Sequence, residues 1–275
     1  MTSPTTNLTP TTRTITLPSG QEISLDEYGQ NTDASAVLML HGGAGPRSMA
    51  GFAAGMAEHA YVLVPTHPGF DGTPRAEATT SIADLADAYL DLIDALELEH
   101  VFVVGSSLGG WIASEMGLRD NHGRLSALTL LGASGIKPEA GTEIADPTKI
   151  GPVRTGELAF HNPRFRLDPA ALSDAQRANM LSNAAAQALY GGVDKHFDPK
   201  LAARLHRITI PVLVIAGEQD GIVPVDYQRT LAAGFPRSTF RIVAEAGHFP
   251  HIEQPGAVFG HIGEFVETEV KPDGE

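Results

Sequence analysis

Ser107 has the clearest chemical context of any residue in the chain. Residues 105–109 read GSSLG, a G-x-S-x-G pattern that directly follows the apolar run Val101–Val104 and directly precedes a helical segment. This pattern is typical of a sharp turn from a strand into a helix, where glycines remove Cβ atoms that would collide. The turn would hold the Ser107 hydroxyl above a sheet, at a helix N-terminus. We therefore predict that Ser107 is a nucleophile and that Ser106 is structural.

A serine hydroxyl is barely ionised at neutral pH, so a nearby imidazole must accept its proton. His248 lies in the segment AEAGHFP, residues 244–250, between the last predicted strand and the last predicted helix. That position predicts a loop at the carboxyl edge of the sheet, and His248 is the expected general base. His251 and His261 are the rival histidines, and both are expected at the start of a helix or within one. Since the base must be neutral, activity should fall at acid pH.

A third group usually fixes the orientation and tautomer of the base. Asp220 lies in GEQDGIVP, residues 217–224, which follows the apolar run Val212–Ala216. We expect Asp220 to be this acid, with Glu218 and Asp226 as competing carboxylates of solvating or capping type. The loop that follows the preceding predicted strand, residues 131–135, reads LGASG and has no carboxylate, which favours Asp220.

The tetrahedral intermediate of such a reaction needs backbone N–H donors aimed at its oxyanion. Residues 41–45, HGGAG, follow the apolar run Ala36–Leu40. The amides of Gly43 and Leu108 are the predicted pair, and Ala44 is a lesser candidate.

Short apolar runs bounded by glycine or proline indicate the strands that position these loops. Residues 13–17 and 21–28 alternate around PSG and predict an edge hairpin. The predicted buried strands are Ala36–Leu40, Tyr61–Val64, Val101–Val104, Ala127–Leu131 and Val212–Ala216, with a last strand at Thr239–Val243. The predicted helices are Ser81–Leu96, Leu108–Leu118, Asp226–Ala233 and Pro255–Val270. This alternation predicts an α/β fold with a mostly parallel, doubly wound sheet of about eight strands.

The regular alternation stops between residues 133 and 207, where six prolines separate short helical pieces. We interpret this segment as a helical cap or lid inserted into a core made of residues 13–132 and 208–270. Residues 1–12 are expected to form a disordered leader, and the last five residues, KPDGE, a polar tail.

The blocks HGGAG, PTHPGFDGTP, GSSLGG, GEQDGIVP and GHFPHIEQP resemble the α/β-hydrolase superfamily across about residues 13–270. The most similar group within it is that of cap-bearing serine hydrolases: esterases, enol-lactonases and carbon–carbon bond hydrolases of aromatic degradation. The resemblance implies that the cap covers the pocket and selects the substrate. It also agrees with the chain order Ser107, Asp220, His248.

Two residues separate this chain from parts of that superfamily. Ser107 stands where similar haloalkane dehalogenases and epoxide hydrolases have aspartate, so neither of those chemistries is expected. Phe249 stands where many carbon–carbon hydrolases have tryptophan, which weakens membership in that group. Trp111, the single tryptophan of the chain, is expected to pack behind the nucleophile.

The cap and the loop after the base should supply the substrate pocket. The predicted lining residues are aromatic: Phe160, Phe165, Tyr190 and Phe249, with His161 and Phe197 as further candidates. Four arginines could hold a substrate carboxylate, but surface arginines are common; they are Arg47, Arg75, Arg164 and Arg166. Asp71 is expected in a turn.

Composition excludes several classes of function. The net charge is −14 with no basic cluster, which argues against nucleic acid as a partner. The chain has no cysteine, and its apolar runs have the length of strands, so we expect a soluble, cytoplasmic protein without a membrane partner. The predicted partner is a small-molecule substrate, with no metal and no cofactor. A homo-oligomer remains open.

The expected function is therefore hydrolysis of a carboxylic ester of a small organic substrate through an acyl-enzyme. The first alternative is hydrolysis of a carbon–carbon bond in a vinylogous diketone, or of a lactone. The second is a ligand-binding receptor with vestigial hydrolase activity, similar to some plant hormone receptors of the α/β-hydrolase superfamily.

Overall fold

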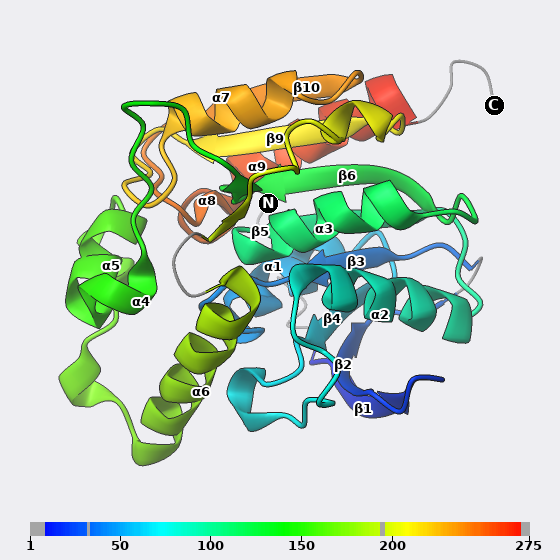
Figure 1. The fold of residues 1–275 in the computed structure, drawn as a ribbon, viewed down its shortest axis with the longest axis horizontal. Helices are drawn as coiled ribbons and strands as arrows, with labels where there is room; N and C mark the ends of the chain where they lie inside the picture. The colour runs from blue at the N-terminus through cyan, green and yellow to red at the C-terminus, as the bar shows by residue number, and fades with distance from the viewer. Residues whose placement is uncertain (1–8, 32–33, 193–195, 271–275) are drawn as a thin grey trace, which may run out of the picture.

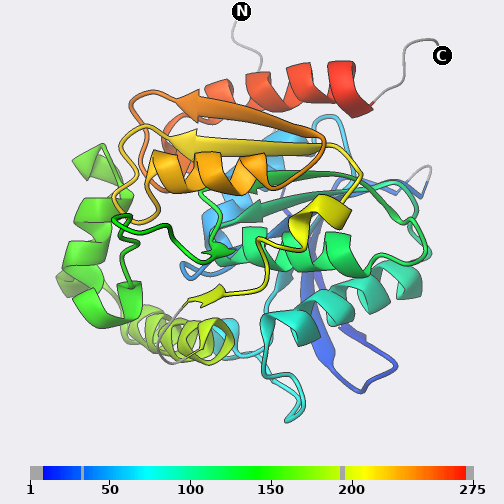
Figure 2. The same cartoon turned by 45° about the horizontal axis from the view of Figure 1, so that its top comes forward.

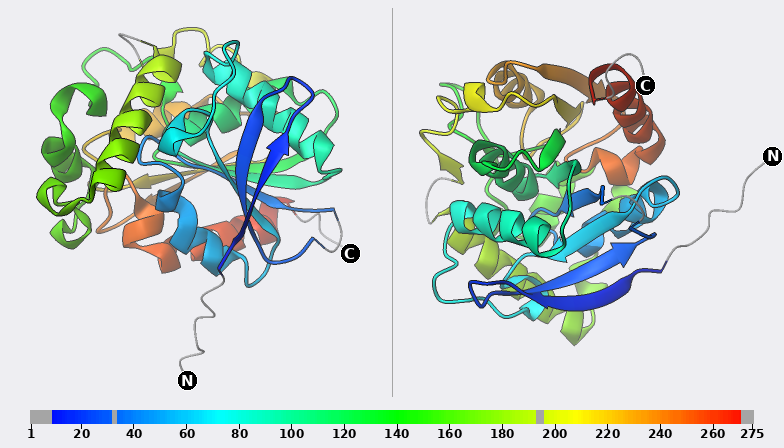
Figure 3. Two further views of the ribbon diagram at one scale, coloured as in Figure 1. Left: turned by 90° about the horizontal axis from the view of Figure 1, so that it is seen from below. Right: turned by 90° about the vertical axis from the view of Figure 1, so that its right-hand side faces the viewer.

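Eight strands form one sheet in the order β1-β2-β4-β3-β5-β6-β9-β10. The structure is a computed structural model that describes residues 9–31, 34–192 and 196–270. The strands are β1 (Thr11–Thr16), β2 (Glu22–Tyr28), β3 (Val37–Leu40), β4 (Val62–Thr66), β5 (Val101–Ser106), β6 (Leu125–Leu131), β9 (Val212–Gly217) and β10 (Ser238–Val243). Strand β2 is antiparallel to both β1 and β4, and the pairs from β4 to β10 are parallel. Figure 3 shows the β1–β2 hairpin at one edge of the sheet.

The central strands are buried along nearly their whole length because helices cover both faces of the sheet. Every residue of β3, β4 and β9 is buried, as the continuous apolar runs predict for a parallel sheet. The two outer strands differ: β1 is mostly exposed, and β10 has only one buried residue. Burial along the sequence therefore marks the centre and the edges of the sheet.

Two layers of helices enclose the sheet (Figure 1). Their bounds are α1 (Arg47–Met56), α2 (Ile82–Ala95), α3 (Leu108–Arg119), α7 (Val225–Ala233), α8 (Pro250–Glu253) and α9 (Pro255–Phe265). Apolar residues of α2, α3 and α7 share one core cluster with the strands, and residues of α1 and α9 share the other. The sheet is thus doubly wound, and both faces carry a core.

The last part of the predicted cap segment, residues 199–207, packs beside α3, where Arg204 donates to Glu115. The part with residues 144–192, called the cap from here on, lies beyond one end of the sheet (Figure 2), and strands β9 and β10 point towards it. It contains α4 (Pro147–Ile150), α5 (Pro152–Ala159), α6 (Asp174–Gly191) and the short 3₁₀ turns η2 (Pro163–Phe165) and η3 (Pro169–Ala171). Proline occupies the first position of four of these five elements, where no intrahelical N–H is required. A two-residue parallel pair, β7 (Gly135–Ile136) with β8 (Phe197–Asp198), brings the two ends of the segment together.

The predicted α/β fold, with about eight strands in a mostly parallel doubly wound sheet, is confirmed. Several boundaries differ from the sequence-based expectation. Strand β1 begins at Thr11, two residues before the predicted start of the core. Helix α9 ends at Phe265 and continues as a π-helical turn, Val266–Val270. Helix α1 was not predicted. Residues 1–8 of the expected leader and the expected tail, residues 271–275, lie outside the described residues.

Among the described residues, no helix combines the length and the apolar character that crossing a membrane requires.

Candidate active site

Ser107 occupies a sharp turn between β5 and α3, with φ 53° and ψ −115°. A non-glycine residue rarely adopts this left-handed region, so the surroundings must hold it there. Two flanking glycines allow the close approach: a Cβ atom at Gly105 would lie 2.3 Å from the Gly109 carbonyl oxygen. A Cβ atom at Gly109 would lie 2.0 Å from the Leu40 oxygen. The predicted strand–turn–helix geometry is therefore present around Ser107.

His248 and Asp220 form a buried pair at the carboxyl ends of the strands. His248 Nδ1 lies 2.8 Å from Asp220 Oδ2. The other carboxylate oxygen, Oδ1, accepts the backbone N–H groups of Ile222 at 2.8 Å and Val223 at 2.9 Å. Since a carboxylate accepts hydrogen bonds, Nδ1 carries the proton and Nε2 is left as the basic nitrogen of the ring.

The end of β6 brings the serine turn and this pair close to each other. The Ser107 amide donates to the Leu131 carbonyl oxygen at 2.9 Å. The next residue, Gly132, has φ 53°, and a Cβ atom there would lie 3.0 Å from His248 Nδ1. A side chain at position 132 would thus displace the imidazole of His248. Within the described part of the chain the Ser107 hydroxyl forms no hydrogen bond. The hydrogen bond between a catalytic serine and its base often becomes short only when the substrate binds.

The rival residues have other surroundings. His251 belongs to α8, is 2% exposed and packs edge-on against Phe52 of α1. His261 is on α9, and Asp226 is in the first turn of α7. Glu218 is exposed and accepts a hydrogen bond from the Gln219 side chain. None of the four joins the contact between His248 and Asp220.

The loop after β3 lies beside the serine turn. A Cβ atom at Gly42 would lie 2.8 Å from Ser107 Cβ and 3.5 Å from its Oγ, so the loop and the hydroxyl are in contact distance. The backbone N–H groups of Gly43 and Leu108 donate to no acceptor in residues 9–31, 34–192 and 196–270. The same is true of Ala44, so this criterion does not separate the two loop candidates. Unpaired amides at this place are what an oxyanion requires.

A buried network of two histidines and a tyrosine fixes the start of this loop. The His67 backbone N–H donates to His41 Nε2 at 3.0 Å, so His41 Nδ1 carries the proton that it donates to the Gly42 oxygen at 2.8 Å. His67 Nε2 donates to the His41 oxygen at 2.8 Å, and the Tyr89 hydroxyl donates to His67 Nδ1. The two rings stack, with centroids 3.7 Å apart. In one neutral tautomer of each histidine, both ring nitrogens thus have a hydrogen-bond partner.

Burial keeps both of these rings uncharged. Desolvation lowers the pKa of His67 to about 4. It also lowers the pKa of His41 well below its usual value, and the neighbouring His67 lowers it further. Desolvation raises the pKa of Tyr89 well above 10. The loop is therefore held by a set of hydrogen bonds that does not change near neutral pH.

Residues 244–249, which carry the predicted general base His248, form the loop between β10 and α8 and are called the base loop. Glu253 of α8 joins this loop to the cap. Its side chain accepts the Gly247 N–H at 2.6 Å and, from the segment after α5, the N–H groups of His161 at 3.2 Å and Asn162 at 2.7 Å. The His248 N–H also donates to the Ala159 oxygen at 2.7 Å. The base loop and the cap segment after α5 are thus one hydrogen-bonded unit.

The aromatic residues predicted to line the pocket fall into two places. Phe249 contacts the His248 ring, and Phe160 packs on Phe249 with centroids 5.2 Å apart. Phe165 in turn stacks on Phe160 at 6.2 Å. Tyr190 of α6 is separate from this group: it is 4% exposed, and its hydroxyl donates to the Pro68 oxygen at 2.8 Å.

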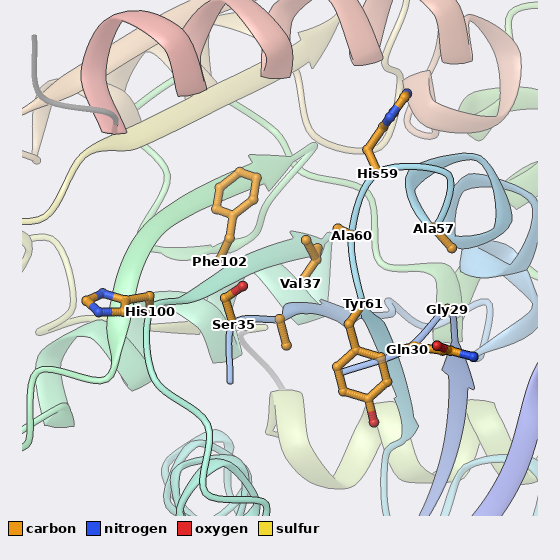
Figure 4. A pocket seen from close by; sticks show the side chains of 11 residues that line it. Gly29, Gln30, Ser35, Val37, Ala57, His59, Ala60, Tyr61, His100 and Phe102 are labelled. Carbon is orange, nitrogen blue, oxygen red and sulfur yellow. The ribbon is translucent and has the colours of Figure 1, made fainter. Parts of the chain in front are cut away.

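A cavity of about 380 Å³ lies at the end of the sheet opposite to Ser107. Figure 4 shows the side chains that line it. Its lining includes Val37 and Phe102 at the amino ends of β3 and β5, together with His59, Tyr61 and His100. Because Ser107, Asp220 and His248 follow the carboxyl ends of strands, this cavity is not part of the candidate active site.

In the described ranges, no group of three or more histidine or acidic side chains is arranged to hold a metal ion.

Sequence reasoning gave no role to several residues of this region. His41 and His67 each follow a buried strand directly, which is a recognisable signal for a buried polar group at the sheet edge. Glu253 precedes Gln254-Pro255 at a helix junction, and no local pattern shows that its partners are backbone amides 91 and 92 residues away. Asp71, expected in a turn, has φ 48° and pairs with Asn183 of the cap.

Comparison with known proteins identifies the family. The family model described as "Alpha/beta hydrolase family" matches residues 37–261. The chain belongs to this family.

Similar proteins include enzymes that act on different bonds. A 2-hydroxy-6-oxononadienedioate/2-hydroxy-6-oxononatrienedioate hydrolase of Cupriavidus pinatubonensis is 28% identical, over 90% of this chain and 92% of that protein. A pimeloyl-[acyl-carrier protein] methyl ester esterase of Aromatoleum aromaticum is 27% identical, over 80% of this chain and 93% of that protein. The solved structure of an esterase from Exiguobacterium antarcticum is 19% identical with a TM-score of 0.75, over 94% of this chain and 100% of that chain. The chain is a hydrolase of the α/β-hydrolase fold.

Proposed function

We propose that the protein is a serine hydrolase that cleaves a carboxylic ester of a small organic substrate through an acyl-enzyme. Ser107 is the nucleophile, His248 the general base and Asp220 the acid that orients it. The single observation that carries the proposal is the strained turn at Ser107 beside the buried pair of His248 and Asp220. A structural serine would have no need for that backbone conformation.

The acylation step follows from the hydrogen bonds of the site. His248 Nε2 removes the hydroxyl proton as Ser107 Oγ attacks the carbonyl carbon, and the amides of Gly43 and Leu108 bind the oxyanion. Collapse of the tetrahedral intermediate breaks the ester bond, and the leaving alkoxide takes the proton from His248. The Asp220 carboxylate stabilises the imidazolium during this step.

Deacylation repeats the step with water in place of serine. His248 removes a proton from the water as its oxygen attacks the acyl carbon, and the same two amides bind the second oxyanion. The acid product then leaves as Ser107 Oγ recovers its proton from His248.

The cap sets the size and character of the substrate in this proposal. Phe160, Phe165 and Phe249 would form an apolar wall next to the base, since Phe249 contacts His248, Phe160 contacts Phe249, and Phe165 contacts Phe160. Tyr190 would contribute its ring face, because its hydroxyl is already bonded to the core. A small acyl or alcohol group with apolar surface fits such a wall.

The test is the initial rate of hydrolysis of p-nitrophenyl esters from acetate to octanoate, with Ser107→Ala beside the wild type. We expect the variant to lose a factor on the order of 10⁶ in kcat. Ser106→Ala is the matched control, because the buried Ser106 hydroxyl has no hydrogen-bond partner among the described residues. Equal activity of wild type and Ser107→Ala would contradict the proposal.

A second candidate function is hydrolysis of a carbon–carbon bond in a vinylogous diketone or of a lactone. The similarity to the Cupriavidus pinatubonensis hydrolase favours it. Turnover of a ring-cleavage diketone or of a lactone at a kcat/KM above that of every ester would replace the ester in our proposal and keep the three residues in their roles.

A further inference from the structure

One side of helix α6 of the cap packs on two loops of the core, residues 41–45 and residues 67–73. Asn183 Oδ1 accepts the Asp71 N–H at 2.7 Å, and its Nδ2 donates to Asp71 Oδ1 at 3.0 Å. One residue before the helix ends, the Tyr190 hydroxyl donates to the Pro68 oxygen at 2.8 Å. These bonds fix the position of α6 above the loop of residues 67–73.

Gln187 lies on the same side of α6, four residues after Asn183 and three before Tyr190. A Cβ atom at Gly43 would lie 2.1 Å from Gln187 Oε1 and 3.1 Å from its Nε2. The carboxamide therefore rests directly on Gly43, whose N–H is one of the two proposed oxyanion donors. Glycine, which has no Cβ atom, leaves room at position 43 for the Gln187 carboxamide.

Unlike its two neighbours, the Gln187 carboxamide has no hydrogen-bond partner in the described part of the chain. The side chain is only half-buried, and a carboxamide can both donate and accept. Its neighbours on α6 use their polar groups to hold the cap in place. Gln187 is thus a polar group placed at the reaction centre with its hydrogen bonds unused.

We propose that Gln187 is a specificity-determining residue that binds an oxygen or nitrogen atom on the carbon next to the scissile carbonyl. The inference rests on the proposed function, because Gly43 must bind the oxyanion for Gln187 to lie beside the acyl group. Within the acyl group, a substituent on the α-carbon is the polar atom that can come closest to the carbonyl oxygen. The preferred substrates are accordingly esters of α-alkoxy, α-hydroxy or α-amido acids.

Two isosteric esters test this inference. The acyl chains of p-nitrophenyl methoxyacetate and p-nitrophenyl butanoate have the same length and differ by one oxygen in place of one methylene group. Gln187→Met keeps the length of the side chain and removes its donor and acceptor. Gln30→Met is the control, since the exposed Gln30 lies at the other end of the sheet.

The readout is the ratio of kcat/KM for the methoxyacetate to kcat/KM for the butanoate, because the intrinsic reactivity of each ester cancels between proteins. We expect Gln187→Met to lower this ratio by about tenfold, as for the loss of one hydrogen bond, and Gln30→Met to leave it unchanged. An unchanged ratio in Gln187→Met, with both rates retained or both reduced equally, would overturn the inference and leave ester hydrolysis standing. Absence of turnover of both esters by the wild type would instead contradict the proposed function.

Discussion

The carboxylate of Asp220 connects the ring of His248 to the turn that follows β9. One oxygen faces His248 Nδ1 at 2.8 Å, and the other accepts two backbone N–H groups of that turn. The two oxygens thus have separate partners, so the orientation of the ring and the shape of the turn can be perturbed independently.

Asp220→Asn should separate these two roles. The asparagine oxygen can still accept from Ile222 and Val223, whereas its NH₂ group would face His248 Nδ1 and favour the wrong tautomer. We expect kcat for ester hydrolysis to fall on the order of 10⁴-fold with a nearly unchanged melting temperature. Glu218→Gln, in an exposed side chain two residues earlier, is the control and should retain full activity. Loss of activity in Glu218→Gln alone would assign the acid to Glu218.

The contact between Gly42 and Ser107 predicts a second effect. In Gly42→Ala the new methyl group would lie 2.8 Å from Ser107 Cβ and 3.0 Å from the Ser106 oxygen, so the serine or the loop must move. Because small displacements of reacting groups are costly, we expect kcat/KM to fall about 10²-fold or more.

Gly51→Ala is the matched control for this substitution. No atom lies within 4 Å of a Cβ at Gly51, which is exposed on α1, so alanine should raise the free energy of unfolding by up to about 1 kcal/mol at full activity. Steady-state kinetics and urea unfolding of both variants check the pair. Equal kinetics in Gly42→Ala and wild type would show that the loop does not constrain the nucleophile.

The sequence alone predicted the parts of this molecule whose signals are local. The buried strands appear as apolar runs, and the turn at Ser107 appears as two glycines at a fixed spacing between a strand and a helix. The partners of His248 could also be narrowed down, because loops at the carboxyl ends of parallel strands meet at one edge of the sheet.

Other parts depend on contacts between distant segments, which no local pattern contains. The carboxylate of Glu253 is held by backbone amides of the cap, and any residue type could supply those amides. Gln187 gained its place from the docking of α6 on the loops near Asp71 and Pro68. Helix α1 was missed because residues 47–56 contain two glycines, which lower helix propensity, while packing of Met49, Phe52 and Ala53 in the core stabilises it.

His251 predicts a pH dependence of stability. Burial lowers the pKa of His251 to about 4, against an opposing effect of the Ser48 backbone. The value in the unfolded chain is about 6.5. Between these values the unfolded chain binds a proton that the folded chain does not, so the free energy of unfolding falls as the pH drops from about 6.5 towards 4. At pH 5 this single histidine should cost about 2 kcal/mol relative to neutral pH.

His251→Phe tests that contribution. The ring lies among Phe52 and Phe249, and neither of its nitrogens forms a hydrogen bond of normal geometry with the described residues. Phenylalanine should therefore fit and remove the titration. Urea unfolding at pH 7 and pH 5 should show a loss of stability on acidification that is smaller by about 2 kcal/mol than in the wild type. The same loss in both proteins would contradict the lowered pKa of His251.

Glu253→Gln should weaken the connection between the base loop and the cap. Glu253 Oε2 accepts from Gly247 and His161 while Oε1 accepts from Asn162, so the NH₂ group of glutamine would face at least one amide N–H. Each amide left without an acceptor costs about 1–3 kcal/mol, so the free energy of unfolding should fall by at least this amount. Because Gly247 precedes His248, kcat should fall as well.

Glu264→Gln on α9 is the control for Glu253→Gln, since the ion pair of Glu264 with Arg241 is largely exposed and should contribute about 0–1 kcal/mol. Equal stability and equal kcat in the two variants would show that the carboxylate of Glu253 does not hold the base loop.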